Sequence, residues 1–175
     1  MAGFGQLVER SEEEEIIERL KESSGGRGEF YYDGHFGGTP AALYRDEQFV
    51  PDYDADLTAQ VSWLRPHEFT ASPEYFIDGS SSGDVVQGRL GDCWFLSSLS
   101  VLATRPSLVK RLIVSDTNAK KYGIYTVKFS QAGVWRYVTV DDRVPCSKCG
   151  KPLYARSLDP NETWVMILEK AYAQL

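Results

Sequence analysis

The chain has 175 residues, of which 42% are hydrophobic, 13% aromatic and 25% charged, and its formal net charge is −6 at pH 7. These values predict a folded domain with one hydrophobic core, and the acidic balance argues against nucleic acid as a partner. No apolar run reaches the roughly 20 residues that a membrane span needs, and no signal-peptide pattern follows Met1. Three cysteines are too few for a disulfide scaffold, so we expect a cytoplasmic protein.

Residues 1–40 differ in composition from the rest of the chain. Ser11 and Glu14 have the spacing of a helix capping box. The apolar positions that follow form one narrow stripe: Ile16, Ile17 and Leu20. We therefore predict a short surface helix from Ser11, whose acidic residues 12–15 are solvated. The glycines between residues 25 and 40 predict a flexible linker after it.

Residues 41–175 are denser in Trp, Tyr and Val, and we expect them to form the folded domain. An apolar helix is predicted to begin near Cys93 and to end before Pro106. Its buried face carries apolar residues at helical spacing: Phe95, Leu99 and Leu102. This helix is expected at the centre of the fold.

A β-hairpin and a final helix complete the predicted elements. Apolar residues alternate with polar ones on both sides of residues 130–133, which predicts the hairpin. Asp159, Pro160 and Glu162 match an N-cap, a first-turn proline and a capping-box acid, so a helix is expected to follow. These elements predict an α+β fold.

The segment 87–94 places a cysteine at a predicted helix start. Free N–H groups and the helix dipole stabilise a thiolate there, so Cys93 is a candidate nucleophile. Gln87 offers a side-chain donor that, with the N–H of Cys93, would bind a developing oxyanion. The alternative is that Cys93 is a small buried hydrophobic residue, as many cysteines are.

The sequence resembles the calpain family of papain-like cysteine proteases. The motifs that carry the resemblance stand in one order over roughly residues 44–175: WLRP at 63–66, QGRLGDCW at 87–94, WRYV at 135–138, VDD at 140–142, NETW at 161–164 and LEKAYA at 168–173. The resemblance implies that residues 41–175 form the first, nucleophile-bearing subdomain of the protease core. It also implies that Cys93 is the catalytic nucleophile and Gln87 the oxyanion-hole residue.

The family's general-base His and its orienting Asn follow the Cys, on a second subdomain. Here the histidines are His35 and His67, and both precede Cys93. We therefore expect the chain to stop before the second subdomain, at Leu175, and to be inactive alone, because the thiol lacks its base. The implied partners are protein substrates and that second subdomain.

The resemblance further implies a Ca²⁺ site. Its ligands would be the carbonyl oxygens of Ile77 and Gly79 and the carboxylates of Asp84 and Glu162, which are the hard oxygen donors that Ca²⁺ prefers. Two alternatives stay open, because Glu162 fits a helix cap and Asp84 fits a turn. An EF-hand is excluded, since the twelfth position of a loop from Asp78 is Arg89.

Cys146 and Cys149 form a C-x-x-C pair outside the family's motifs. One pair supplies half the ligands of a structural zinc, and no thioredoxin-like context surrounds it. We interpret the pair as two incidental thiols at a hairpin-exit turn, with a shared zinc or a redox pair as alternatives.

Together these features predict a calcium-dependent intracellular cysteine endopeptidase. The alternative from another class is a non-catalytic, calcium-responsive interaction module.

Overall fold

The computed structural model describes residues 4–23, 29–34, 36, 38, 40–43, 61–77, 81, 83–115 and 118–175. His35 and Gly79 lie outside the described residues.

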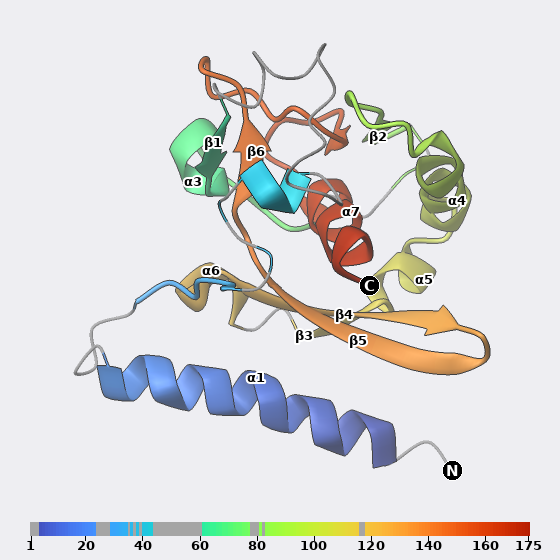
Figure 1. Cartoon of the computed structure of the whole chain (residues 1–175). Helices are drawn as coiled ribbons and strands as arrows, with labels where there is room; N and C mark the ends of the chain where they lie inside the picture. Colours follow the sequence, from blue (N-terminus) through green and yellow to red (C-terminus); the bar gives the residue numbers. More distant parts are fainter. Residues whose placement is uncertain are drawn as a thin grey trace.

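Helices and strands both contribute to the fold (Figure 1). The helical elements are α1 (Phe4–Ser23), η1 (Pro40–Leu43), α3 (Pro66–Phe69), α4 (Cys93–Ala103), α5 (Pro106–Lys110), α6 (Ala119–Tyr122) and α7 (Trp164–Gln174). The strands are β1 (Ser62–Leu64), β2 (Val85–Val86), β3 (Ile113–Ser115), β4 (Ile124–Gln131), β5 (Val134–Asp141), β6 (Val144–Cys146) and β7 (Arg156–Ser157). The α+β class expected from the sequence is confirmed.

The antiparallel sheet β3-β4-β5 has helices on both faces, with α1 on one side and α7 on the other (Figure 1). Along β4, Ile124 and Thr126 meet α1, whereas Tyr125 and Val127 belong to the core beside α7. This alternation follows from the two-residue period of a strand. Thr126, a polar residue of this alternation, is buried as well.

The predicted hairpin is present. β4 pairs with β5 in one continuous register from Ile124–Asp141 to Gln131–Val134. The two turn residues, Ala132 and Gly133, have φ values of 51° and 79°, which are the left-handed values of a tight hairpin turn. The turn therefore matches the twist of the two strands.

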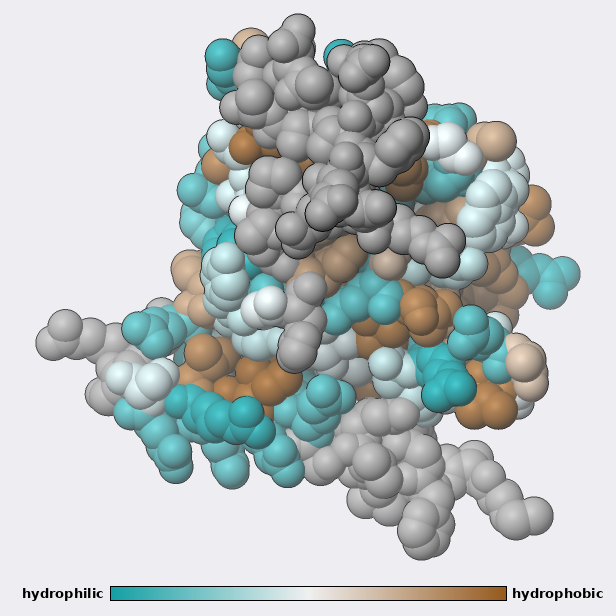
Figure 2. Space-filling model, viewed as in Figure 1, coloured by the Kyte–Doolittle hydropathy of each residue, from teal (hydrophilic) through white to brown (hydrophobic). Residues whose placement is uncertain are grey.

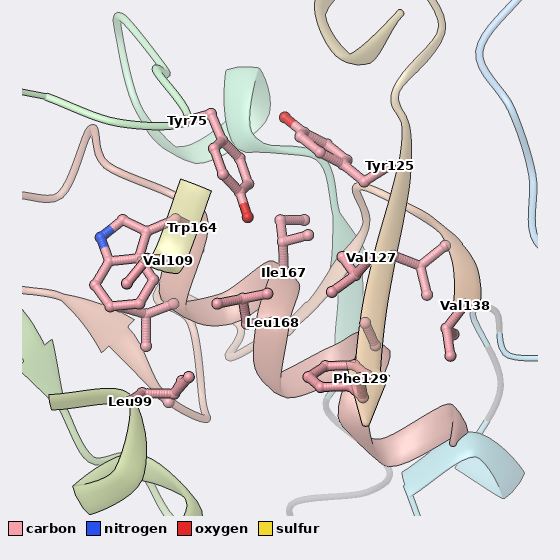
Figure 3. Packing of buried hydrophobic residues seen from close by; sticks show 14 of the residues in the cluster. Tyr75, Leu99, Val109, Tyr125, Val127, Phe129, Val138, Trp164, Ile167 and Leu168 are labelled. Atoms are coloured by element: carbon pink, nitrogen blue, oxygen red, sulfur yellow. The ribbon is translucent and has the colours of Figure 1, made fainter. Parts of the chain in front are cut away.

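The core is built around α7, where every residue from Trp164 to Ala171 is buried. Figure 3 shows Ile167 and Leu168 of this helix between Leu99 of α4 and Val127 of β4. By contrast α4, which we expected at the centre, buries one face only and leaves Val101 exposed. The central helix is thus α7, because it is enclosed by the sheet, α4 and the loops before it.

Helix α1 begins at Phe4, seven residues before the predicted start, so Ser11 lies inside the helix and is not its N-cap. The acidic run is also not fully solvated. Glu13 is 5% exposed and accepts hydrogen bonds from the Thr126 hydroxyl (2.7 Å) and the Asn118 side chain (3.0 Å). Hydrophilic residues line the outer side of α1 in Figure 2, whereas Ile17 packs against the sheet.

The described part of the predicted linker packs on the core. Asp33 is 1% exposed, and its N–H donates to the Asp141 carboxylate at 3.0 Å. The guanidinium carbon of Arg143 lies 3.7 Å from the centroid of the Tyr32 ring, and Phe30 stacks on His67. Residues 29–33 are therefore held by specific contacts, so the expectation of a flexible linker is wrong there.

A buried ionic cluster joins this segment to the sheet and to α7. The fully buried Asp141 carboxylate accepts hydrogen bonds from Lys170 Nζ and from Arg143 Nε (2.8 Å) and Nη2 (2.6 Å). Beside it, Asp142 pairs with Arg65. No helix among the described residues is both long and apolar enough to cross a bilayer.

Candidate active site

Residues 84–89, which lead to Cys93, are hydrogen-bonded to residues 153–158, which precede α7. The Leu158 N–H donates to the Asp84 carbonyl at 2.8 Å, β2 pairs with β7, and the Arg89 N–H donates to the Leu153 carbonyl at 3.1 Å. Gly88 passes so close that a Cβ there would lie 2.2 Å from a backbone atom of Tyr154. A glycine is therefore required at this crossing.

Cys93 is the first residue of α4, and its side chain is exposed and not in a disulfide. The helix begins there because the carbonyl of Asp92 accepts the N–H groups of Phe95 (2.8 Å) and Leu96 (3.1 Å). The Cys93 thiol thus lies at the positive end of a three-turn helix, where an anion is stabilised. The alternative of a buried cysteine is wrong.

Gln87 lies on the same loop and is exposed. Its Nε2 donates to the Leu90 carbonyl at 3.0 Å, which fixes the side chain over the turn before Cys93. The amide therefore has a second N–H available for an incoming oxygen, since a Gln side chain carries two.

Trp94, beside the nucleophile, is 58% exposed. Its ring packs edge-on against Tyr172 of α7, with the ring centroids 5.4 Å apart. An indole held in this way, with more than half its surface in water, offers a rigid apolar contact next to Cys93.

Glu162 does not cap α7, because that helix begins at Trp164 with Thr163 as its N-cap. Glu162 instead forms a bridge with Glu74, is 2% exposed, and accepts the N–H of Ile77 at 2.9 Å. Burial, and then the negative charge of Asp84, raise its pKa above the ordinary 4.5. The helix-cap interpretation is therefore wrong, and Asp84, the other predicted carboxylate ligand, acts on Glu162 through its charge.

Asp84 is half-buried, and its Oδ2 accepts the N–H of Ser81 at 2.5 Å. A cation bound near Glu162 would offset the electrostatic effect of Asp84 on this buried carboxyl group. Oxygen donors of this kind fit Ca²⁺. Within the described residues no group of three or more His, Cys, Asp and Glu side chains is positioned to bind a metal.

His67 belongs to α3, which lies on the opposite side of α7 from α4 (Figure 1). It stacks on Phe30 with the ring centroids 5.3 Å apart. His67 therefore does not lie beside Cys93.

Comparison with known proteins supports the sequence resemblance. The model of the family described as "Calpain family cysteine protease" matches residues 31–175. The chain belongs to the calpain family of cysteine proteases.

Three relatives of this calpain-family chain illustrate the similarity. The calpain-type cysteine protease ADL1 of Oryza sativa subsp. japonica is 41% identical over 148 residues, a match that covers 75% of this chain and 7% of that protein. Calpain-12 of Homo sapiens is 39% identical over 150 residues, covering 85% and 20%. Calpain-A of Drosophila melanogaster is 41% identical over 117 residues, covering 66% and 14%. The chain thus spans about a fifth of these relatives' length, or less.

The two cysteines of the C-x-x-C pair, Cys146 and Cys149, differ in burial. Cys146 in β6 is fully buried, which raises the pKa of its thiol to about 12, whereas Cys149 is exposed. The turn between them closes with a hydrogen bond from the Gly150 N–H to the Ser147 carbonyl at 2.8 Å. A buried protonated thiol suits neither redox chemistry nor metal binding, which favours the incidental interpretation.

Sequence reasoning missed two acidic residues behind the nucleophile, Asp92 and Glu169. Both are buried, at 9% and 7% exposure. The available signal was Glu169 itself, a charged residue that follows five apolar residues in the predicted helix.

Proposed function

We propose that this calpain-family chain is the nucleophile half of a calcium-dependent cysteine endopeptidase that cleaves proteins inside the cell. In this proposal residues 1–40 form an N-terminal extension and residues 41–175 the first subdomain of the protease core. The observation that carries it is the exposed Cys93 thiol at the first residue of α4.

Cys93 would act as a thiolate, which the first N–H groups of α4 stabilise, and attack the carbonyl carbon of a peptide bond. The oxygen that becomes negative would be bound by the N–H of Cys93 and the side chain of Gln87. The amine then leaves with a proton, the acyl group stays on sulfur, and water releases it.

A second subdomain would supply the His that takes and returns the proton, and the Asn that orients it. Exposed apolar side chains beside the nucleophile support a docking surface on this side: Leu90 is 39% exposed and Trp94 58% exposed. The 175 residues alone are then expected to be inactive.

Calcium would be bound by Asp84 and Glu162 with the carbonyls of Ile77 and Gly79. Its charge would remove the repulsion between the two carboxylates and join the loop before β2 to the residues before α7. Because the chain from Asp84 to Arg89 is hydrogen-bonded along residues 153–158, order at the metal site would extend to Cys93.

The nucleophile is tested by alkylating the 175-residue chain with iodoacetamide at neutral pH and mapping the labelled peptides. Cys93 is expected to react faster than Cys149, which is also exposed and so is the matched reference. Equal rates at the two sites would reject a primed nucleophile. In the longest form of the protein, Cys93→Ala is expected to abolish casein cleavage. A form that binds Ca²⁺ and never cleaves casein would instead support the interaction module.

The metal site is tested by thermal melts with and without Ca²⁺. At a concentration of about 100 times Kd, binding is expected to stabilise the fold by about 2.7 kcal/mol. Glu162→Gln is expected to lose this shift, whereas Asp159→Asn, an exposed acid three positions away, keeps it. A shift of equal size in Glu162→Gln would remove Glu162 from the ligand set.

A further inference from the structure

Two buried carboxyl groups lie directly behind the start of α4, and the chemistry proposed above does not use them. Asp92 precedes Cys93 in the chain, and Glu169 comes from α7. Like charges that are removed from water repel strongly, so such a pair is stable when it shares a proton.

Asp92 occupies the N-cap position of α4 but does not cap the helix with its side chain. An Asp in this position ordinarily turns its carboxylate back to accept the first free N–H groups. Here the carboxyl group is buried instead, and no backbone N–H among the described residues donates to its Oδ1. The N–H groups beside Cys93 are therefore left free of carboxylate.

The side chain of Glu169 interacts with Asp92 in the protein interior. Both of its oxygens accept the N–H of Ala155, at 3.1 and 3.0 Å. Burial, and then the charge of Asp92, raise the pKa of Glu169 to about 8, and a hydrogen bond joins the two side chains. At neutral pH Glu169 is thus protonated and donates to the Asp92 carboxylate.

No cation among the described residues neutralises this pair. Lys170, the next residue on α7, is turned to Asp141 and to the carbonyl of Arg143 (2.9 Å). Of the charged groups in the described part of the chain, Asp92 is the one that shifts Glu169. The proton on Glu169 therefore decides whether the two side chains attract or repel.

We propose that Glu169 is a positioning residue for the nucleophile: its carboxylic acid group donates a hydrogen bond that keeps Asp92 turned inward, so that the first N–H groups of α4 face Cys93. The proposal rests on the proposed role of Cys93. When Glu169 loses its proton, repulsion frees the Asp92 carboxylate to occupy these N–H groups and places a negative charge beside the thiolate.

The test measures iodoacetamide alkylation of Cys93 against pH, from about pH 6 to about pH 9, in wild type, Glu169→Gln and Glu169→Ala. Cys149 in the same chain is the internal reference. Glu169→Ala is expected to slow Cys93 by about tenfold at neutral pH, which is less than the roughly hundredfold loss that a misplacement of about 1 Å can cause. Glu169→Gln is expected to stay within about twofold, because an amide still donates to Asp92 and accepts from Ala155.

The pH profile separates positioning from mere stability. With each rate divided by that of Cys149 in the same protein, the Cys93 rate of wild type relative to that of Glu169→Gln is expected to fall above about pH 8. Superimposable profiles in these two proteins would overturn the proposal, even where Glu169→Ala fails to fold. If wild-type Cys93 never reacts faster than Cys149, the proposed nucleophile itself is rejected, and this inference with it.

Discussion

Replacing Asp141 by asparagine tests the buried ionic cluster that joins α7 to the sheet. Asp141 is 0% exposed, and it receives Lys170 Nζ, two nitrogens of the Arg143 guanidinium, and the Asp33 N–H. Asparagine keeps the size of the side chain and removes its charge. Two cations, at 6% and 9% exposure, then lose their counterion.

Leaving a buried charge without its partner costs about 3–5 kcal/mol. For a chain of this length 1 kcal/mol corresponds to roughly 2–4 °C in Tm, so we expect Asp141→Asn to melt roughly 10 °C below wild type. Adding Lys170→Met removes one of the two stranded cations. The double variant is therefore expected to recover part of the loss instead of adding to it.

The assay is thermal and urea unfolding at neutral pH, with the exposed Asp159→Asn as the control. Burial alone would raise the pKa of Asp141, but the charge of Lys170 and several hydrogen bonds lower it below 3.8. Its stabilisation is therefore present at neutral pH and lost as the pH falls through that lowered pKa. The gap between wild type and Asp141→Asn must shrink in acid. A gap under about 1 kcal/mol at neutral pH would refute the reasoning.

Three further outcomes are expected. Gly88→Ala forces a methyl group into the Tyr154 backbone and should cost about 1–3 kcal/mol in urea unfolding while slowing alkylation of the nucleophile. Glu13→Ala removes the acceptor of the buried Thr126 hydroxyl and of the part-buried Asn118 side chain and should cost about 1–3 kcal/mol, whereas the exposed Glu14→Ala stays within about 0.5 kcal/mol. Glu169 binds its proton more tightly in the folded than in the unfolded protein, so the free energy of unfolding is expected to fall as the pH rises from about 4.5 to about 8. At roughly 1.4 kcal/mol per pKa unit, this fall reaches several kcal/mol. Thermal melts across this pH range should show a flatter dependence in Glu169→Gln.

Sequence patterns predicted the elements that bury one face against the rest of the protein. The hairpin of β4 and β5 and the helix from Cys93 were predicted correctly, because alternation, turn residues and helical spacing are properties of adjacent residues. The start of α1 was predicted wrongly, since Ser11 and Glu14 match a cap pattern inside a longer helix. A pattern permits a cap there, and the preceding residues continue the helix.

Contacts between distant segments were beyond sequence reasoning. Thr126 and Glu13 look like solvated residues until α1 covers the second face of β4. Glu162 has the spacing of a cap residue, yet it forms a strand-like bridge with Glu74, and α7 begins two residues later, at Trp164. The partners in these hydrogen bonds are separated by 85 and 113 positions, so no local pattern specifies them.

Placing the central helix at residues 164–174 has a consequence for synthesis on the ribosome. The nucleophile segment and the sheet pack against side chains of α7 or against the residues just before it. A nascent chain that has not yet exposed residue 174 therefore holds Cys93 and the apolar face of β4 without their enclosing layer. Folding of this part of the chain is therefore expected to follow the synthesis of α7, and until then the apolar face of β4 is open to non-native contacts.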